Sequence, residues 1–265
     1  MSNTFAIKEV MDFVVERYSS SGRGTELFHS DYPAETSINT SAERLSIRGG
    51  QGNYKLLDLD HTKDCTYKAI LPLVDINALA EKLGVSISVG AASAFKRQVL
   101  TADASNQITL SATPTADTLI IHALSEERDL GDLQTAGTPV SVVNEYSISG
   151  RVVTLNATTA PVGTKFVVTY NYTSGITAQN IKITASDFPG FITIRGVGLV
   201  DDDQAGEKIP VSFTIHKAKV QPSFELTMNE SNATELDFTV DCYTVLNSAG
   251  NREFIDIVKL NDEAY

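Results

Sequence analysis

Hydrophobic and polar residues alternate with a period of two along much of the C-terminal quarter of the chain. The pattern runs through Val211–His216 and returns at Phe224–Met228 and at Leu236–Cys242. Strands with this period bury one face and leave the other in water, as antiparallel sheets often do. Turn residues separate the runs, and Phe254–Leu260 predicts a last strand. This quarter therefore predicts a β-meander.

The N-terminal part carries weaker signals for strands and one clear signal for a helix. Val10–Tyr18 fits an amphipathic helix by its spacing, but it is rich in Val, Phe and Tyr and ends at a Ser- and Gly-rich stretch typical of a hairpin tip. We expect a strand there and another at Tyr67–Leu73. A helix is predicted between Asp75, which can cap the first turn, and Gly84, which stands where a C-cap belongs.

The middle of the chain differs in composition from its two flanks. Residues 98–180 are rich in Thr, Ser, Ala and Val, and turn signals recur at short intervals between predicted strands such as Val152–Leu155 and Phe166–Tyr172. This spacing is typical of a small β-sandwich. We predict a host domain of residues 1–97 and 181–265 with a β module inserted in one of its loops. The predicted fold class is all-β with one flanking helix.

Charge and composition narrow the classes of function. The 265-residue chain carries 33 acidic and 21 basic residues, a formal net charge of −12. Its basic residues are scattered, which argues against a nucleic-acid binder that would cluster Lys and Arg. No apolar run approaches the roughly 20 residues of a membrane helix, and the first residues lack a secretory signal. We expect a protein that is made in a cytoplasm and does not associate with a membrane.

Candidate catalytic and metal-binding groups are few. Cys65 and Cys242 stand far apart in the sequence without metal-ligand spacing, so we interpret them as small buried hydrophobic residues, the alternative being a disulfide or a reactive thiol. The histidines share no ligand spacing, and no nucleophile, cofactor or paired-carboxylate motif is found. We predict no enzyme, no cofactor and no metal site.

An acidic run at Asp201, Asp202 and Asp203 invites a calcium interpretation because hard cations prefer carboxylate oxygens. The spacing of an EF-hand is missing, however. We interpret the run as a solvated acidic loop between two strands.

A glycine-rich run suggests a phosphate cradle, and it comprises Gly49, Gly50, Gly52 and Asn53. It lacks the Lys-Ser/Thr of a P-loop and the helix that would follow one. We expect a tight turn or bulge that needs positive φ angles.

One ordered set of segments runs through both halves of the chain: Ile47–Leu56, Asp60–Asp64, Leu71–Leu73, Ile181–Gly190, Ile215–Lys219, Pro222–Met228 and Leu236–Val240. In this order the segments resemble the tail tube, or major tail, proteins of long-tailed bacteriophages. The resemblance implies a β-sandwich or barrel-like core with a flanking helix. It also implies that copies assemble into stacked rings, commonly of six, around a central channel.

The same resemblance implies a virion protein of the tail, assembled in the host cytoplasm from copies of itself and in contact with other phage tail proteins. DNA would pass through the channel without specific binding. An acidic wall suits this role because it repels a polyanion, so we expect Asp and Glu residues on the channel strands, the alternative being ordinary surface charge. The glycine-rich turn would then permit close backbone approach between copies.

Two other classes of function stay open. A virion decoration or receptor-binding module would contact a surface through the inserted module without forming a tube. A glycan hydrolase on a β scaffold would use a pair among Asp201, Asp203 and Glu207, although paired carboxylates are common by chance in acidic proteins.

Overall fold

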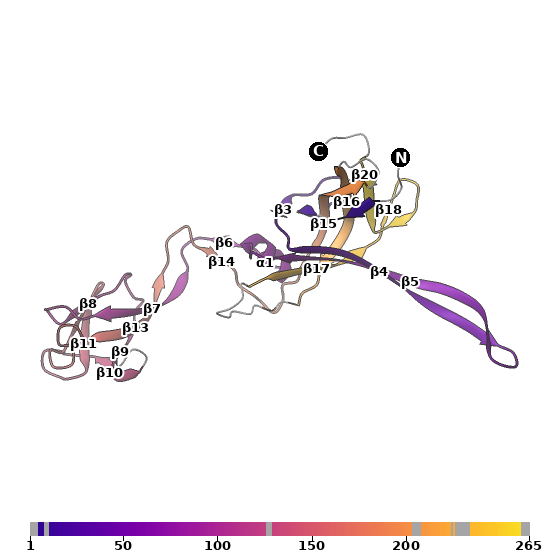
Figure 1. Cartoon of the computed structure of the whole chain (residues 1–265). Coiled ribbons are helices and arrows are strands. Elements are labelled where there is room, and N and C mark those ends of the chain that lie inside the picture. Colours follow the sequence, from indigo (N-terminus) through magenta and orange to yellow (C-terminus); the bar gives the residue numbers. More distant parts are fainter. Residues whose placement is uncertain are drawn as a thin grey trace. The chain divides into compact units, whose positions relative to one another are not determined.

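The chain divides into two structural units, and the second lies in sequence between the two segments of the first. The structure is a computed structural model that describes residues 5–7, 11–125, 129–202, 208–223, 225 and 234–260. Unit 1 comprises Met1–Ile87 and Ile181–Tyr265, and unit 2 comprises Ser88–Asn180. Both units are built from strands, and the described part of the chain contains one α-helix (Figure 1). The predicted all-β class with a flanking helix is confirmed.

Unit 1 is organised around one antiparallel sheet of nine strands. The strand order is β3-β2-β15-β16-β17-β5-β4, with β1 beside β15 and β20 beside β16. The strands are β1 (Phe5–Ile7), β2 (Asp12–Arg17), β3 (Glu26–Ser30), β4 (Glu35–Gly49), β5 (Tyr54–Leu71), β15 (Phe191–Asp202), β16 (Lys208–Val220), β17 (Leu236–Tyr243) and β20 (Ile255–Lys259).

Strand β16 is the corner at which this sheet folds over on itself. Its residues Val211–Ile215 pair with β20, whereas Lys217–Val220 pair with β17. A register shift opposite Ile192–Ile194 marks a bulge between the two halves, and bulges bend strands. The first layer therefore holds β3, β2, β15, the first half of β16 and β20. The second layer holds the other half of β16, β17, β5 and β4, which makes the sheet nearly a closed barrel.

Aromatic side chains fill the space between the two layers. Phe28 of β3 meets Phe238 of β17 edge-on at 5.2 Å between ring centroids, and Phe13 of β2 meets Tyr67 of β5 at 5.9 Å. Edge-to-face contacts of this kind contribute beyond the burial of area alone. The alternation that predicts the strands places these residues in the core, because Phe13 and Val15 are buried while Asp12 is exposed.

The helix α1 (Ile76–Leu83) lies against β3 and β17. Asp75 accepts a hydrogen bond from the Asn77 amide at 2.7 Å, and Gly84 adopts a left-handed φ of 70° as the C-cap, so both predicted caps are confirmed. Ala78 is buried in the core. The helix covers part of the apolar space that the folded sheet leaves open.

Unit 2 is a second β domain with its own core. Its sheet has the order β7-β13-β9-β10-β11-β12-β8, in which β10 and β11 are parallel. The strands are β7 (Ser93–Thr101), β8 (Gln107–Thr109), β9 (Ile120–Leu124), β10 (Leu130–Ala136), β11 (Glu145–Ser149), β12 (Val152–Leu155) and β13 (Lys165–Thr173). Residue 98, the first of the predicted insertion, lies inside β7, which pairs with β13 along its whole length.

Short strand pairs complete the architecture. Strand β6 (Ser88–Val89) pairs with β14 (Gln179–Asn180) where the chain passes between the units. Strand β18 (Val245–Leu246) pairs with β19 (Arg252–Glu253) just before β20. The strand predicted at Phe224–Met228 lies outside the described residues, save for residue 225.

Candidate assembly interface

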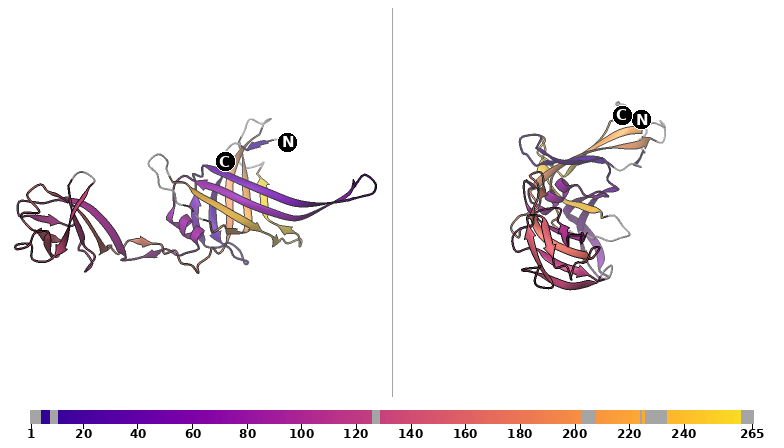
Figure 2. Two further views of the ribbon diagram at one scale, coloured as in Figure 1. Left: turned by 90° about the horizontal axis from the view of Figure 1, so that it is seen from below. Right: turned by 90° about the vertical axis from the view of Figure 1, so that its left-hand side faces the viewer.

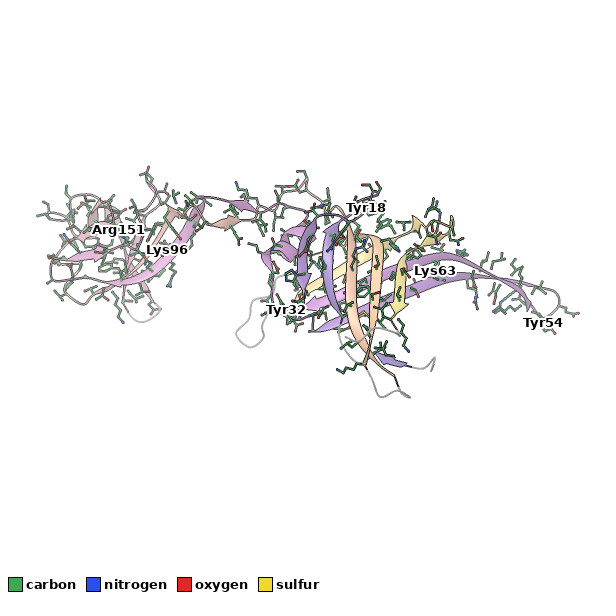
Figure 3. All side chains as sticks on the ribbon, turned by 90° about the horizontal axis from the view of Figure 1, so that it is seen from above. Tyr18, Tyr32, Tyr54, Lys63, Lys96 and Arg151 are labelled. Carbon is green, nitrogen blue, oxygen red and sulfur yellow. The ribbon has the colours of Figure 1, made fainter. Side chains whose placement is uncertain are left out.

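The longest hairpin of unit 1 extends well beyond the core. Strands β4 and β5 have 15 and 18 residues, and on β5 the buried positions begin only at Cys65. We call residues 40–64 the arm. It is a two-stranded ribbon that reaches away from the layers, with Tyr54 near its end (Figures 2 and 3). An isolated two-stranded ribbon is at best marginally stable in water.

One face of the arm carries a row of four aliphatic side chains. Leu45 pairs with Leu59 and Ile47 pairs with Leu57 across the ribbon. Their side chains remain between 41% and 54% exposed. Contiguous exposed apolar side chains on a soluble chain mark interaction sites. We call these four residues the apolar row.

The other face of the arm is charged and internally paired. The Arg44 guanidinium Nε lies 2.6 Å from the Asp60 carboxylate, and Lys55 lies 2.6 Å from Asp58. The hydrogen bond from Arg44 lowers the pKa of Asp60, and the bond from Lys55 lowers the pKa of Asp58. The arm is thus an amphipathic ribbon with a wet face and an apolar face.

The apolar row points away from the core of its own subunit. Strand β4 alternates without interruption, and its even position Ile38 packs against the core, so the odd positions Leu45 and Ile47 belong to the opposite face. On β5 an extra residue, Thr62, forms a bulge with a φ of 49°. Because of this bulge, Leu57 and Leu59 share the face of Leu45 rather than that of Cys65.

The glycine-rich run forms the tip of the arm. Gly50, Gly52 and Asn53 have φ angles of 80°, 99° and 52°, and the Asn53 amide donates to the Gly50 carbonyl at 3.1 Å. Gly49 is the last residue of β4. The predicted turn with positive φ is therefore confirmed. A contact between these residues and another copy stays a prediction.

The first layer offers open strand edges at both of its sides. Within the described residues, β3 pairs only with β2 and β20 pairs only with β16. Each edge therefore presents a row of backbone donors and acceptors to one side. Unprotected edges of this kind template pairing with another chain.

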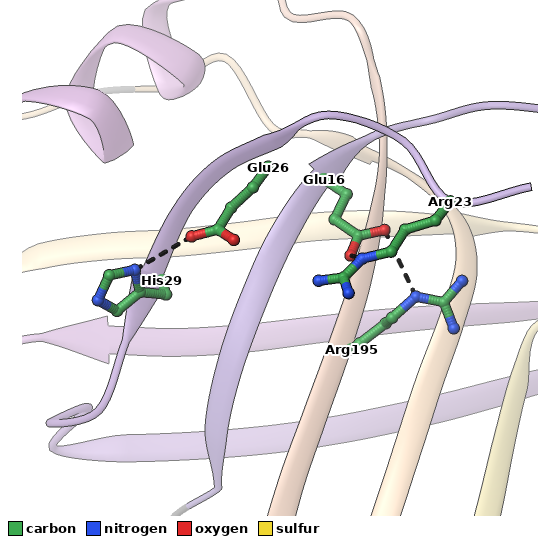
Figure 4. A network of polar contacts seen from close by, with 5 residues as sticks. All are labelled: Glu16, Arg23, Glu26, His29 and Arg195. Atoms are coloured by element: carbon green, nitrogen blue, oxygen red, sulfur yellow. Dashed lines mark hydrogen bonds and ion pairs between the residues drawn. The ribbon is translucent and has the colours of Figure 1, made fainter.

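The face of the first layer opposite the core carries acidic, basic and neutral polar side chains beside Val14 and Val197. It forms a shallow groove lined by Asp12, Asp31, Arg195 and Thr214, among others. Glu16 shares this face because it alternates with the buried Phe13 and Val15 on β2. Its carboxylate contacts two guanidinium groups, those of Arg23 and Arg195 (Figure 4). We call this surface the polar face of the first layer.

Two residues of the acidic run, Asp201 and Asp202, lie in a strand where the sequence suggests a loop. Asp201 and Asp202 are the last residues of β15, and Asp201 pairs with Lys208 at the start of β16. The pairing of β15 with β16 thus continues into the start of the segment interpreted as a solvated loop. Asp203 and Glu207 lie outside the described residues, so a hydrolase pair is not tested.

The two cysteines, distant in sequence, meet in the second layer. Both are free and buried, as predicted. The pairing of β5 with β17 ends at Thr66 opposite Asp241, one position before Cys65 and Cys242. Their thiols hydrogen-bond each other, and burial raises the pKa of both. A raised pKa suppresses thiolate chemistry, so this pair serves packing.

The described part of the chain was also considered for metal ligands and membrane-spanning helices. No group of three or more His, Cys, Asp or Glu side chains converges there as a metal site would require. The described helix has eight residues, and no helix in these ranges has the length and apolar character to cross a bilayer.

Comparison with known proteins gives one family. The family model described as the YomU/Tube protein family matches residues 5–257, a range that includes unit 2. None of the curated proteins compared with the chain matches it.

Proposed function

Because the chain belongs to the YomU/Tube protein family, we propose that its copies assemble into rings that stack into the tail tube of a long-tailed bacteriophage. DNA would pass through the channel of this tube during delivery. The role is structural and requires no catalysis. The protein would act in the virion tail, in contact with other tail proteins.

The apolar row of the arm is the observation that carries this proposal. The row faces away from the core of unit 1, and the arm is only two strands wide, so the described residues of unit 1 leave it half exposed. Burying the exposed part of four aliphatic side chains would contribute roughly 3–6 kcal/mol per arm. A second copy of the chain supplies the needed surface in a homo-oligomer, and every copy contributes an arm.

Open edges on both sides of the first layer support closure into a ring. If the β20 edge of one copy pairs with the β3 edge of the next, the contact joins two different surfaces. Such a head-to-tail contact closes into a ring when the rotation between copies allows it. Closure also removes the exposed edges, as it does in barrels.

The polar face of the first layer is the surface we assign to the channel. A continuous layer of strands has two faces, and the opposite one is already occupied by the core. The polar face carries Asp12, Asp31 and Glu26 on β2 and β3 or just after them, and Asp256 on β20. These acids give the wall a negative potential that disfavours retention of DNA phosphates.

Two double variants at alternating positions of β5 test the role of the arm. Leu57→Ser with Leu59→Ser removes half of the apolar row, and we expect soluble, folded protein that fails to form rings or tubes. Asp58→Ser with Asp60→Ser changes the alternate positions of the same strand. Since exposed ion pairs contribute only about 0–1 kcal/mol, this control should still assemble.

Sedimentation velocity and negative-stain imaging of concentrated protein report the outcome, and circular dichroism reports folding. Equal assembly of the two double variants would overturn the role assigned to the apolar row. A wild-type protein that stays monomeric at high concentration and binds cells or capsids would favour the decoration or receptor-binding function instead.

A further inference from the structure

Glu16 is a fully buried carboxylate on a face that is otherwise wet. Its side chain is 0% exposed, although its neighbours along β2 show that it points away from the core. Two arginine side chains lie against its carboxylate. Arg23 comes from the turn between β2 and β3, and Arg195 comes from β15 (Figure 4).

The geometry of this cluster ties both guanidinium groups to one carboxylate. Arg23 Nε lies 2.6 Å from Glu16 Oε1, and Arg195 Nε lies 3.4 Å from Glu16 Oε2. Each oxygen of Glu16 is therefore directed at a different arginine. The cluster carries one net positive charge, whereas the two arginines without Glu16 would carry two.

The surroundings of the cluster are acidic or neutral. Glu26 is the cross-strand neighbour of Glu16 on β3, and Thr193 is its neighbour on β15. Glu26 itself lies 3.2 Å from His29, and among the described residues the ion pairs of Arg23 and Arg195 are made with Glu16. Glu16 is thus the acid that holds the two arginines on this face.

Arginine is the side chain best suited to hold a phosphate, because its planar group donates two parallel hydrogen bonds. Two arginines in a channel wall would therefore retain passing DNA. We propose that Glu16 masks Arg23 and Arg195, so that the polar face of the first layer does not hold DNA phosphates. This inference rests on the proposed function, in which that face lines the channel.

The ion pairs could also exist for stability alone, since a buried charge needs a partner. Both interpretations expect some loss of stability when Glu16 is replaced. Only masking expects the protein to gain affinity for a polyanion. Retention of DNA by assembled tubes therefore separates the two.

The experiment uses Glu16→Gln, which keeps the size of the side chain and removes its charge. Tubes are incubated with a fluorescent single-stranded DNA of about 12 nucleotides and pelleted at about 50 mM and about 200 mM salt. We expect wild-type tubes to leave the DNA in solution and E16Q tubes to retain it. Two phosphate contacts on a single strand predict about a sevenfold loss of retention between these salt concentrations.

Two further variants identify the cause. Glu26→Gln removes an acid that lies on the same face but is not ion-paired with the two arginines. This variant should behave as wild type. The triple variant E16Q/R23Q/R195Q removes the released arginines, and it should lose the retention of E16Q. Where E16Q does not assemble, Glu16→Asp keeps the charge but shortens the reach by one methylene, and it should show smaller retention of the same sign.

The outcomes are distinct from those of the proposed function. Wild-type protein that forms no tubes contradicts the proposed function itself. The masking role alone is overturned if wild type, E16Q (or E16D) and E26Q all form tubes that leave the DNA in solution. It is also overturned if E26Q tubes retain as much DNA as E16Q tubes.

Discussion

At the scale of single residues, the paired thiols of Cys65 and Cys242 make stability depend on alkaline pH. Burial raises the pKa of both thiols above the ordinary value near 9. In the unfolded chain they ionise first as the pH rises, so the unfolded state releases protons that the folded state keeps. Their contribution is complete below about pH 9 and is lost as the pH rises further.

We therefore expect the free energy of unfolding to fall above about pH 9, by at most about 1.4 kcal/mol per pH unit for each thiol. Urea titrations of wild type and of C65A/C242A measure this slope. The double variant should be less stable at neutral pH but should lose stability more slowly with rising pH. Identical slopes would contradict the assignment.

Gly84 makes a second prediction at this scale. A Cβ atom there would lie 2.2 Å from the carbonyl carbon of Phe188 and 2.3 Å from the nitrogen of Pro189. Gly250 has a similar positive φ of 81° but open space around it. We expect Gly250→Ala to cost about 1 kcal/mol of unfolding free energy and Gly84→Ala about 3 kcal/mol or more. Urea midpoints measure both, and equal losses would show that the segment before β15 does not pack on the helix end.

At the scale of elements, features set by neighbouring residues can be predicted from the sequence, whereas contacts between distant residues cannot. The helix α1 could be bounded from Asp75 and Gly84 because caps depend on side chains within a few residues of the helix end. Burial of Lys82 within that helix could not be foreseen. Its ammonium group donates to the carbonyl of Asp237, and no local pattern links positions so far apart.

The arm shows why part of the candidate assembly interface could not be predicted from the sequence. Odd positions of β5 are apolar both near the tip, at Leu57 and Leu59, and in the core, at Tyr67 and Leu71. Period alone assigns them all to one face. The bulge at Thr62 separates them into two faces, and such a bulge has no firm signature in a single sequence. The turn at the tip, in contrast, was predictable from its glycines.

At the scale of the whole molecule, the division into two units predicts which part builds the tube. Ser88 pairs with Asn180 across the strands that join the units, so a two-residue Asn-Gly turn between them can replace residues 89–179. We expect the shortened chain to fold and to form tubes of unchanged inner diameter. Thr40 pairs with Cys65, and replacing residues 41–64 between them by a similar turn should leave a folded chain that does not assemble.

Electron microscopy of both deletions measures this prediction. The open edges, the arm and the polar face all belong to unit 1, which is why we expect unit 2 to be dispensable for the proposed tube wall. Folded protein without assembly after removal of residues 89–179 would assign unit 2 a part in the ring contacts.

A cryo-electron microscopy reconstruction of the concentrated wild-type protein tests the central claim most directly. We expect closed rings, stacked into a tube, in which Leu45, Ile47, Leu57 and Leu59 of each copy are covered by a neighbour and the face bearing Asp12 and Asp256 surrounds the channel. Isolated monomers at high concentration, or rings whose arms stand uncovered in solvent, would contradict it.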